Sequence, residues 1–197
     1  MSRTTAETGT RERIVNASAD LFRRQGYAAT GVKQIVAAAQ APFGSVYHFF
    51  PGGKEQLGAE AIRTSGRLYE QLIPAVFDPA PDIVTAVRTF FELAGEHLEQ
   101  TDYVDACPIA TIALEISSTS ETLRGACAEV FERWIEAGAT RFEQAGLARR
   151  TARELTVAML SLLEGAFVLA RASRSSAPLE TAGEVAAARV KTALEAS

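Results

Sequence analysis

Helical periodicity runs through this 197-residue sequence almost from end to end, and it restricts the possible folds more than any other feature. Residues suited to a buried face recur every three or four positions, as Ile14, Ser18 and Leu21 do in the first such segment. No sustained run of β-branched residues alternates with polar ones, as half-buried strands would require. The sequence therefore predicts an all-α fold.

Turn and helix-breaking residues divide this pattern into about nine helices, three short ones followed by six longer ones. Gly26 is placed to cap the first helix, Thr30 to begin the second, and Pro42 to occupy the first turn of the third. Pro74 is expected to end the fourth helix, and Asp82 to cap the fifth. The expected ranges are residues 10–25, 31–39, 42–50, 54–73, 83–100, 108–117, 120–145, 151–172 and 179–195.

Composition excludes several classes of protein. Two cysteines, Cys107 and Cys127, cannot form a disulfide framework and fit a reducing compartment. No uninterrupted apolar stretch is long enough for a membrane span, and the N-terminal segment lacks the apolar core of a secretory signal. We therefore expect a cytoplasmic globular protein without a membrane partner.

The net charge of −4 is distributed unevenly along the chain. Residues 1–67 carry nine Lys and Arg residues against five acidic ones, a net charge of +4, whereas residues 68–197 carry a net charge of −8. A polyanion would be attracted by the first third of the chain and repelled by the rest. The charge split favours a nucleic-acid-binding N-terminal region.

Residues 10–57 contain three helices with a tight turn before the third, which is the pattern of a helix-turn-helix unit. In such a unit the last short helix enters the DNA major groove. Gly44 would allow close approach to the bases, and Tyr47 and His48 would place hydrogen-bonding groups near phosphates. Lys54 adds a cation at the start of the next helix. This segment therefore predicts binding to double-stranded DNA.

The same segment resembles the N-terminal signature of TetR/AcrR-family transcriptional repressors. The residues that carry the resemblance are Phe22, Gly26, Tyr27, Thr30, the run Gly44-Ser45-Val46-Tyr47-His48-Phe49-Phe50, Lys54-Glu55 and Leu57. The sequence PGGKEQL and residues 103–110 are similar to the LmrA/YxaF-like branch of the family. The resemblance implies a helix-turn-helix domain in residues 1–53 and a ligand-binding and dimerisation domain in residues 54–197, linked by the helix that starts at Lys54.

The resemblance also implies a set of DNA-contacting residues. Thr30 would contact phosphate through its hydroxyl and its backbone N–H. Phe43 stands where the family frequently has a polar residue, and because it cannot hydrogen-bond a base edge, it would contact a thymine methyl group. Phe49 likewise replaces a frequent second histidine. Ordinary solvated positions are the alternative for Lys33 and His48. The full predicted set is Thr30, Lys33, Pro42, Phe43, Gly44, Ser45, Tyr47, His48 and Lys54.

The large apolar residues of the second domain mainly predict a helical core. The resemblance implies, in addition, a pocket for a small lipophilic molecule, which would be mostly apolar with a few placed polar groups. The predicted lining residues are Phe90, Tyr103, Cys107, Glu115, Trp134, Met159 and Phe167. No nucleophile–base pair, phosphate loop or metal motif is present in the sequence, so we predict no catalytic residue, no metal site and no cofactor.

Two isolated carboxylates interrupt very apolar stretches, Glu115 in TIALEIS and Glu164 in LSLLEGAFV. A buried carboxylate without a partner is costly, so each is expected to have one. Arg171 lies about two turns after Glu164, and an ion pair within the helix or across a dimer is one interpretation. Recognition of a cationic or hydrogen-bonding ligand is the other.

The last two helices are expected to pack against a second copy of the chain. Small residues there would let helices approach closely: Ala158, Ser161, Gly165, Ala166 and Ala172. A dimer would place two recognition helices about 34–36 Å apart, in successive major grooves. We therefore expect a homodimeric repressor that binds a pseudo-palindromic operator and is released by a small lipophilic effector. The alternative is an all-α carrier protein without DNA-binding activity.

Overall fold

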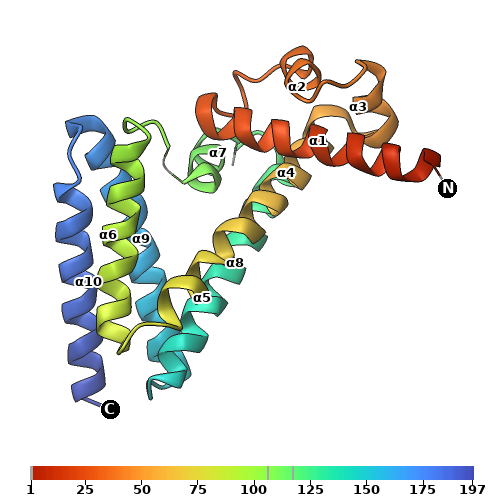
Figure 1. The fold of residues 1–197 in the computed structure, drawn as a ribbon. Helices are drawn as coiled ribbons and strands as arrows, with labels where there is room; N and C mark the ends of the chain where they lie inside the picture. The colour runs from red at the N-terminus through yellow and green to blue at the C-terminus, as the bar shows by residue number, and fades with distance from the viewer. Residues whose placement is uncertain (1, 106, 117) are drawn as a thin grey trace. The chain divides into compact units, whose positions relative to one another are not determined.

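The computed structural model describes residues 2–105, 107–116 and 118–197, with side chains described from residue 9 onward. Ala106, within the family-like segment 103–110, and Ser117, an expected helix end, lie outside the described residues. Over the described ranges the chain is helical without a β-strand, which confirms the predicted all-α fold (Figure 1). The helices are α1 Ser2–Gln25, α2 Val32–Ala38, α3 Gly44–Phe49, α4 Gly53–Glu70, α5 Leu72–Phe77, α6 Ile83–Gln100, α7 Pro108–Ile116, α8 Glu121–Gln144, α9 Arg149–Ser173 and α10 Ala177–Glu195.

The chain forms two compact units. Unit 1 comprises Met1–Leu68 and Pro108–Val130, and unit 2 comprises Tyr69–Cys107 and Phe131–Ser197. The predicted boundary between residues 53 and 54 falls inside unit 1, because that unit includes most of the following helix, and α7 packs against α1. Each compact unit is therefore built from two segments that are separate in the sequence.

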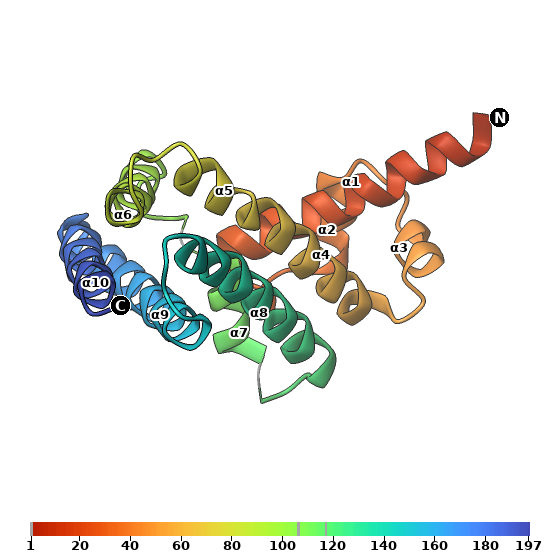
Figure 2. The ribbon, with the colours of Figure 1, turned by 90° about the horizontal axis from the view of Figure 1, so that it is seen from below.

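Unit 1 is built around α1, which packs against α2 and α3 (Figure 2). Ile14 and Phe22 of α1 are fully buried together with Ile35 of α2 and Val46 of α3. Gly26 ends α1 with a φ of +82°, and its N–H donates to the Phe22 carbonyl over 2.9 Å. The predicted glycine cap of α1 is therefore confirmed, since a positive φ suits glycine best.

Three predicted helix ends were wrong in detail. Gly31, not Thr30, is the N-cap of α2. Pro42 precedes α3, where its carbonyl accepts a hydrogen bond from the Ser45 N–H over 2.9 Å and Phe43 is the N-cap. Pro74 does not end a helix: it lies in the first turn of α5, where a missing N–H leaves no helical bond unmade. Short α5 is therefore separate from α4, and the described chain has one more helix than expected.

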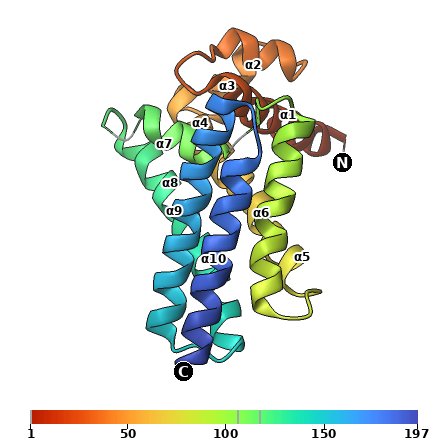
Figure 3. The ribbon, with the colours of Figure 1, turned by 90° about the vertical axis from the view of Figure 1, so that its left-hand side faces the viewer.

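In unit 2, α10 lies alongside both α6 and α9 (Figure 3). A Cβ built on Gly183 of α10 would lie only 2.8 Å from the Cβ of Phe91 on α6, so the absence of a side chain permits this close contact. Phe91, Leu98 and Leu179 are buried there. Asp82 caps α6 by accepting a hydrogen bond from the Thr85 N–H over 2.8 Å, as predicted.

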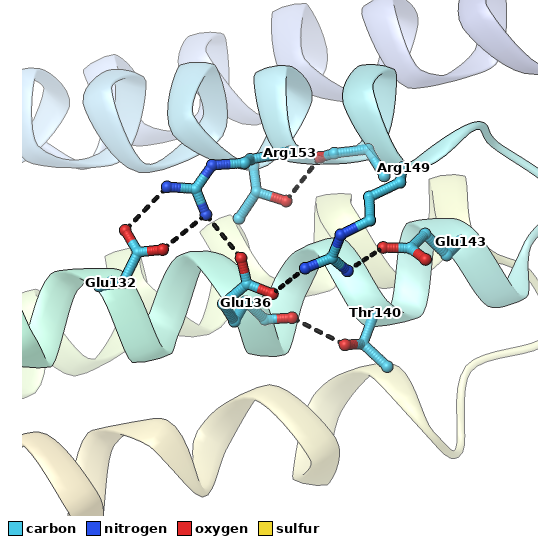
Figure 4. Close-up of polar contacts among 8 residues, drawn as sticks. Glu132, Glu136, Thr140, Glu143, Arg149 and Arg153 are labelled. Carbon is cyan, nitrogen blue, oxygen red and sulfur yellow. Dashed lines mark hydrogen bonds and ion pairs between the residues drawn. The ribbon is translucent and has the colours of Figure 1, made fainter.

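By length and apolar composition, α9 alone among the described helices is able to cross a membrane. One such helix is weak evidence, because core helices of soluble proteins share these properties. An ion-pair network joins α9 to α8: Arg153 contacts Glu132 and Glu136, and Arg149 contacts Glu136 and Glu143, all at 2.6–2.8 Å (Figure 4). We therefore assign α9 to the helical bundle of unit 2.

Candidate DNA-binding face and ligand cavity

The predicted recognition helix presents an exposed aromatic surface. Phe43 and Tyr47 lie one helical turn apart, are 50% and 52% exposed, and have ring centroids 6.0 Å apart. His48 is also exposed, and its ring contacts Phe49 with a centroid separation of 4.8 Å. A Cβ on Gly44 would meet no atom within 4 Å. We call the exposed residues Pro42, Phe43, Gly44, Tyr47 and His48 the α3 face.

The α3 face combines apolar and hydrogen-bonding groups at a surface that a duplex can reach. Fully buried Val46 anchors the opposite side of α3, so the direction of the exposed side chains is fixed. The Tyr47 hydroxyl and the His48 imidazole can donate to phosphate oxygens, while the Phe43 ring suits a thymine methyl group. Lys33 is exposed on α2 and can supply a cation, whereas Ser45 is half-buried.

Thr30 does not belong to this surface, and its predicted phosphate contact was wrong. It is only 1% exposed. Its hydroxyl donates to the Gly26 carbonyl over 2.7 Å and accepts a hydrogen bond from Gln25 over 3.1 Å. Its N–H donates to the Tyr27 carbonyl over 3.2 Å. Both groups that were expected to reach phosphate are therefore used to shape residues 26–30, which we call the α1–α2 turn.

Lys54 also holds the α1–α2 turn. Its Nζ donates to the Tyr27 carbonyl over 2.7 Å and lies 4.0 Å from the centroid of the Tyr27 ring. Burial lowers the pKa of the Lys54 ammonium, and the nearby Glu115 carboxylate opposes that shift. The predicted contact of Lys54 with DNA phosphate stays a prediction, but the side chain already has a structural role.

Glu115 of α7 is the third group on the α1–α2 turn, and its predicted ligand role was wrong. Its Oε2 accepts a hydrogen bond from the Ala28 N–H over 3.0 Å. A Cβ built on Gly26 would lie 1.9 Å from the Glu115 Oε1, so this carboxylate sits directly against the glycine. Glu115 belongs to unit 1 and is not among the residues that line the cavity of unit 2. The partner that a lone carboxylate needs is here a backbone N–H.

Unit 2 contains a cavity of about 350 Å³, lined by residues of α4, α5, α6, α8, α9 and the segment before α7. Five of the residues predicted to contact a ligand lie on its wall: Phe90, Cys107, Trp134, Met159 and Phe167. The structure adds Tyr69, Leu72, Ile73, Val76, Leu93, Ala94, His97, Asp105, Gly138, Thr156, Leu160, Leu163 and Glu164. The cavity is therefore mostly aromatic and aliphatic, as a lipophilic ligand requires.

Tyr103 was also predicted to line the cavity, but it lies outside it. Its backbone has a φ of +61°, its carbonyl accepts a hydrogen bond from the Arg171 Nε over 3.2 Å, and the Arg174 guanidinium lies 5.3 Å from its ring centroid. The chain turn at residues 102–103 directs the ring to Arg174 and the carbonyl to Arg171. Arg171 is thus engaged by Tyr103 and forms no ion pair with Glu164 within α9, whereas a pair across a dimer stays a prediction.

The carboxyl of Glu164 instead lines the cavity. Its Oε1 is buried and has no hydrogen-bond partner among the described residues. Burial raises the pKa of Glu164 to about 7, against the opposing effect of a hydrogen bond with Cys107. Asp105, also buried on the wall, lies with its Oδ2 3.7 Å from the Nε2 of His97. Sequence reasoning missed His97 and did not name Asp105, although Asp105 lies in the loop between the predicted residues Tyr103 and Cys107.

Two protein families match this chain, one over its N-terminal helices and the other over most of the remainder. The family described as "Bacterial regulatory proteins, tetR family" matches residues 14–61, and the "Transcriptional regulator LmrA/YxaF-like, C-terminal domain" matches residues 83–185. The HTH-type transcriptional regulator YxaF of Bacillus subtilis is 35% identical over 175 residues, which are 89% of this chain and 92% of that protein. LmrA of Bacillus subtilis, also an HTH-type transcriptional regulator, is 32% identical over 169 residues, 86% of this chain and 90% of that protein.

A solved structure has the same fold over nearly the whole chain. The TetR transcriptional regulator from Chloroflexus aurantiacus superposes with a TM-score of 0.78 and is 26% identical, covering 95% of this chain and 96% of that one. The similar proteins are transcriptional regulators and not enzymes, which confirms the prediction of a non-enzymatic protein.

Proposed function

Because the chain belongs to the TetR family of bacterial DNA-binding transcriptional regulators, in its LmrA/YxaF-like branch, we propose that it is a homodimeric, cytoplasmic repressor released by a small lipophilic effector. It would bind a pseudo-palindromic operator through two copies of the α3 face. The observation that carries this proposal is the exposure of Phe43, Gly44, Tyr47 and His48 on a helix whose other side is buried. A carrier protein would have no need for such a surface.

An exposed small and apolar strip on α9 supports dimerisation. Leu169 and Val168 are each 61% exposed, and Val157 is 42% exposed. Ala158, Ser161, Gly165 and Ala172 are exposed at helical spacing with them, whereas Ala166 is buried inside unit 2. Large exposed apolar residues beside small ones suit a helix-to-helix contact with a second copy. We infer that α9 contributes to the dimer interface, together with α10, where Val185 is 53% exposed.

Two chain segments connect the cavity residues with the α1–α2 turn. Asp105 and Cys107 line the cavity, and α7 begins immediately afterwards at Pro108 and carries Glu115. Similarly, Tyr69 of α4 lines the cavity, while Lys54 near the start of α4 bonds Tyr27. An effector that binds the released conformation about 100-fold more tightly would supply about 2.7 kcal/mol of coupling.

Selection of binding sites from random duplexes tests the DNA-binding proposal, with and without a small-molecule extract of the cells. We expect an enriched palindrome whose affinity falls steeply with salt concentration. Lys33→Ala should reduce the salt slope by about 1, whereas Lys191→Ala, a matched exposed lysine of unit 2, should not. A folded dimer that enriches no duplex under either condition would overturn the proposal in favour of the carrier protein.

Analytical ultracentrifugation tests the dimer separately. Leu169→Glu should produce a folded monomer that has lost operator affinity. Leu114 is even more exposed, at 83%, but lies on α7 of unit 1, so Leu114→Glu is the matched control and should remain dimeric. A dimeric Leu169→Glu variant would exclude α9 from the interface.

A further inference from the structure

The ionisable groups on the cavity wall include two acidic side chains and a single basic one. Two carboxyl groups, Glu164 and Asp105, lie among its aromatic and aliphatic residues. Neither Lys nor Arg is found among the residues that line it, and His97 is the single basic side chain on this wall. An anionic ligand would therefore meet like charges without a compensating cation.

The position of the Glu164 carboxyl indicates that the protein alone does not satisfy it. Leu163 and Phe167 flank it on the α9 wall. Its Oε1 is shielded from solvent and has no hydrogen-bond partner in the described part of the chain. The neighbouring Cys107 thiol is a weak donor. A buried carboxylate in this setting is costly until a cation or a good donor approaches it.

Two arginines near the C-terminal end of α9 have partners other than Glu164. Arg171 donates to the Tyr103 carbonyl, and Arg174 pairs with Asp102. His97 is 54% exposed and lies 3.7 Å from Asp105, so it is directed to the other carboxyl. The wall thus has a carboxyl at Glu164 with no cation from the protein assigned to it.

On the premise that the cavity is the effector site of the proposed function, we propose that it binds a lipophilic cation: an ammonium group carried on an aromatic or aliphatic body. The ammonium lies at the Glu164 side of the cavity, within the field of Asp105. The apolar body packs against Phe90, Trp134 and Phe167. These rings add attraction for the charge through their electron-rich faces.

A matched pair of probes isolates the charge. Benzyltriethylammonium carries the charge, and 3-benzyl-3-ethylpentane is its neutral carbon isostere. Trp134 lines the cavity and is the only tryptophan in the sequence, so its fluorescence reports binding, with calorimetry as a second readout. We expect the cation to bind at least about tenfold more tightly than the isostere, a difference of about 1.4 kcal/mol. Equal affinities would overturn the proposal.

Glu164→Gln tests the residue while keeping the size of its side chain. We expect this variant to lose about tenfold or more in affinity for benzyltriethylammonium and to keep its affinity for the isostere within about twofold. Glu154→Gln is the matched control, because Glu154 lies on the same helix but is exposed and outside the cavity wall. A Glu164→Gln variant that binds the cation as well as the wild type contradicts the proposal.

The pH dependence of cation binding provides a second test. The cation requires ionised Glu164, so its affinity should rise about tenfold between about pH 6 and pH 8 as the carboxyl, with its pKa of about 7, loses its proton. The other titratable groups on the wall are His97, Asp105, Cys107 and Tyr69. Protonation of His97 would act in the same direction, so the rise must persist in His97→Gln. A flat profile in that variant contradicts the assignment to Glu164.

Operator release separates this proposal from the proposed function. In one outcome, the neutral isostere releases the selected duplex, whereas the cation neither binds the protein nor releases the duplex. This result would support the proposed regulatory function and overturn the cation site. In the other outcome, the cation binds through Glu164 but the protein stays bound to the duplex. This result would support the cation site and overturn the proposal that an effector controls DNA binding through this cavity.

Discussion

Glu115 and Glu164 look alike in the sequence, each a single carboxylate in an apolar helix, yet the two regions use them differently. In unit 1, Glu115 holds a backbone N–H of the α1–α2 turn at 3.0 Å. In unit 2, Glu164 has a buried oxygen without a hydrogen-bond partner among the described residues and lines a cavity. The hydrogen-bond partner that the fold supplies, and not the sequence context, therefore decides whether a lone carboxylate stabilises the fold or is available to a ligand.

The largest effect on stability is expected for Gly26→Ala, which should disrupt the contact of Glu115 with the α1–α2 turn. Alanine at a φ of +82° costs about 1–2 kcal/mol, and its Cβ would displace the Glu115 carboxylate from Ala28. Together with the lost hydrogen bond, we expect the free energy of unfolding to fall by about 3 kcal/mol in urea denaturation. Gly125→Ala, in open space on α8, should instead stabilise by about 0.5–1 kcal/mol. Equal effects of the two substitutions would contradict the role of Gly26.

The stability of the Glu164 region should depend on pH. The folded protein raises the pKa of Glu164 from 4.5 to about 7, so the folded state keeps a proton that the unfolded chain releases. The stabilisation is complete below about pH 4.5 and is lost as the pH rises through about 7. Relative to Glu164→Gln, the wild type should lose about 2–3 kcal/mol of unfolding free energy over this range. Parallel urea curves for both proteins at all pH values would exclude a buried carboxyl.

Glu115→Gln should have a smaller effect and sharpen the contrast with Glu164→Gln. It replaces a charged acceptor at Ala28 by a neutral one, so we expect a loss of about 1 kcal/mol in unfolding free energy. Operator affinity should fall, measured by fluorescence anisotropy with the selected duplex, whereas affinity for benzyltriethylammonium should stay the same. Glu164→Gln should instead lower the affinity for benzyltriethylammonium and leave the operator affinity unchanged. Glu121→Gln, on the exposed surface of α8, is expected to change neither affinity.

The smallest effect is expected at the network between α8 and α9. Arg153→Lys removes the guanidinium that contacts both Glu132 and Glu136 (Figure 4). Because these groups are at least partly exposed to solvent, the melting temperature should fall by about 1 °C at low salt, and the difference should vanish near 1 M NaCl. A large loss that persists in high salt would show that the network packs α9 rather than only adding surface charge pairs.

The exposure of the α3 face could be predicted from the sequence because this surface is local. Phe43, Gly44, Tyr47 and His48 lie within one short segment, and helical spacing with the buried Val46 fixes which of them are exposed. Thr30 shows the limit of this reasoning. A threonine before a helix suits an N-cap, but here its hydroxyl bonds the Gly26 carbonyl behind it in the chain, and no local rule chooses between the two partners.

The cavity was predicted only in part. Phe90, Trp134, Met159 and Phe167 follow from their size and apolar character on the helices of the second domain. Tyr103 was misplaced, because its direction depends on a backbone turn with positive φ that its residue type does not indicate. His97 was missed, and Asp105 was not singled out within the loop between Tyr103 and Cys107, because their importance comes from their shared wall and their 3.7 Å approach, which sequence spacing does not reveal.

The sequence by itself determined the all-α class, the helix-turn-helix segment and the family, because helical periodicity, capping and motif spacing are properties of neighbouring residues. Only the tertiary structure decided that residues 108–130 join the N-terminal unit, that Glu115 and Lys54 hold the α1–α2 turn, and that Glu164 faces a cavity. These outcomes depend on contacts between residues far apart in the chain, whose free energies are settled by packing and burial.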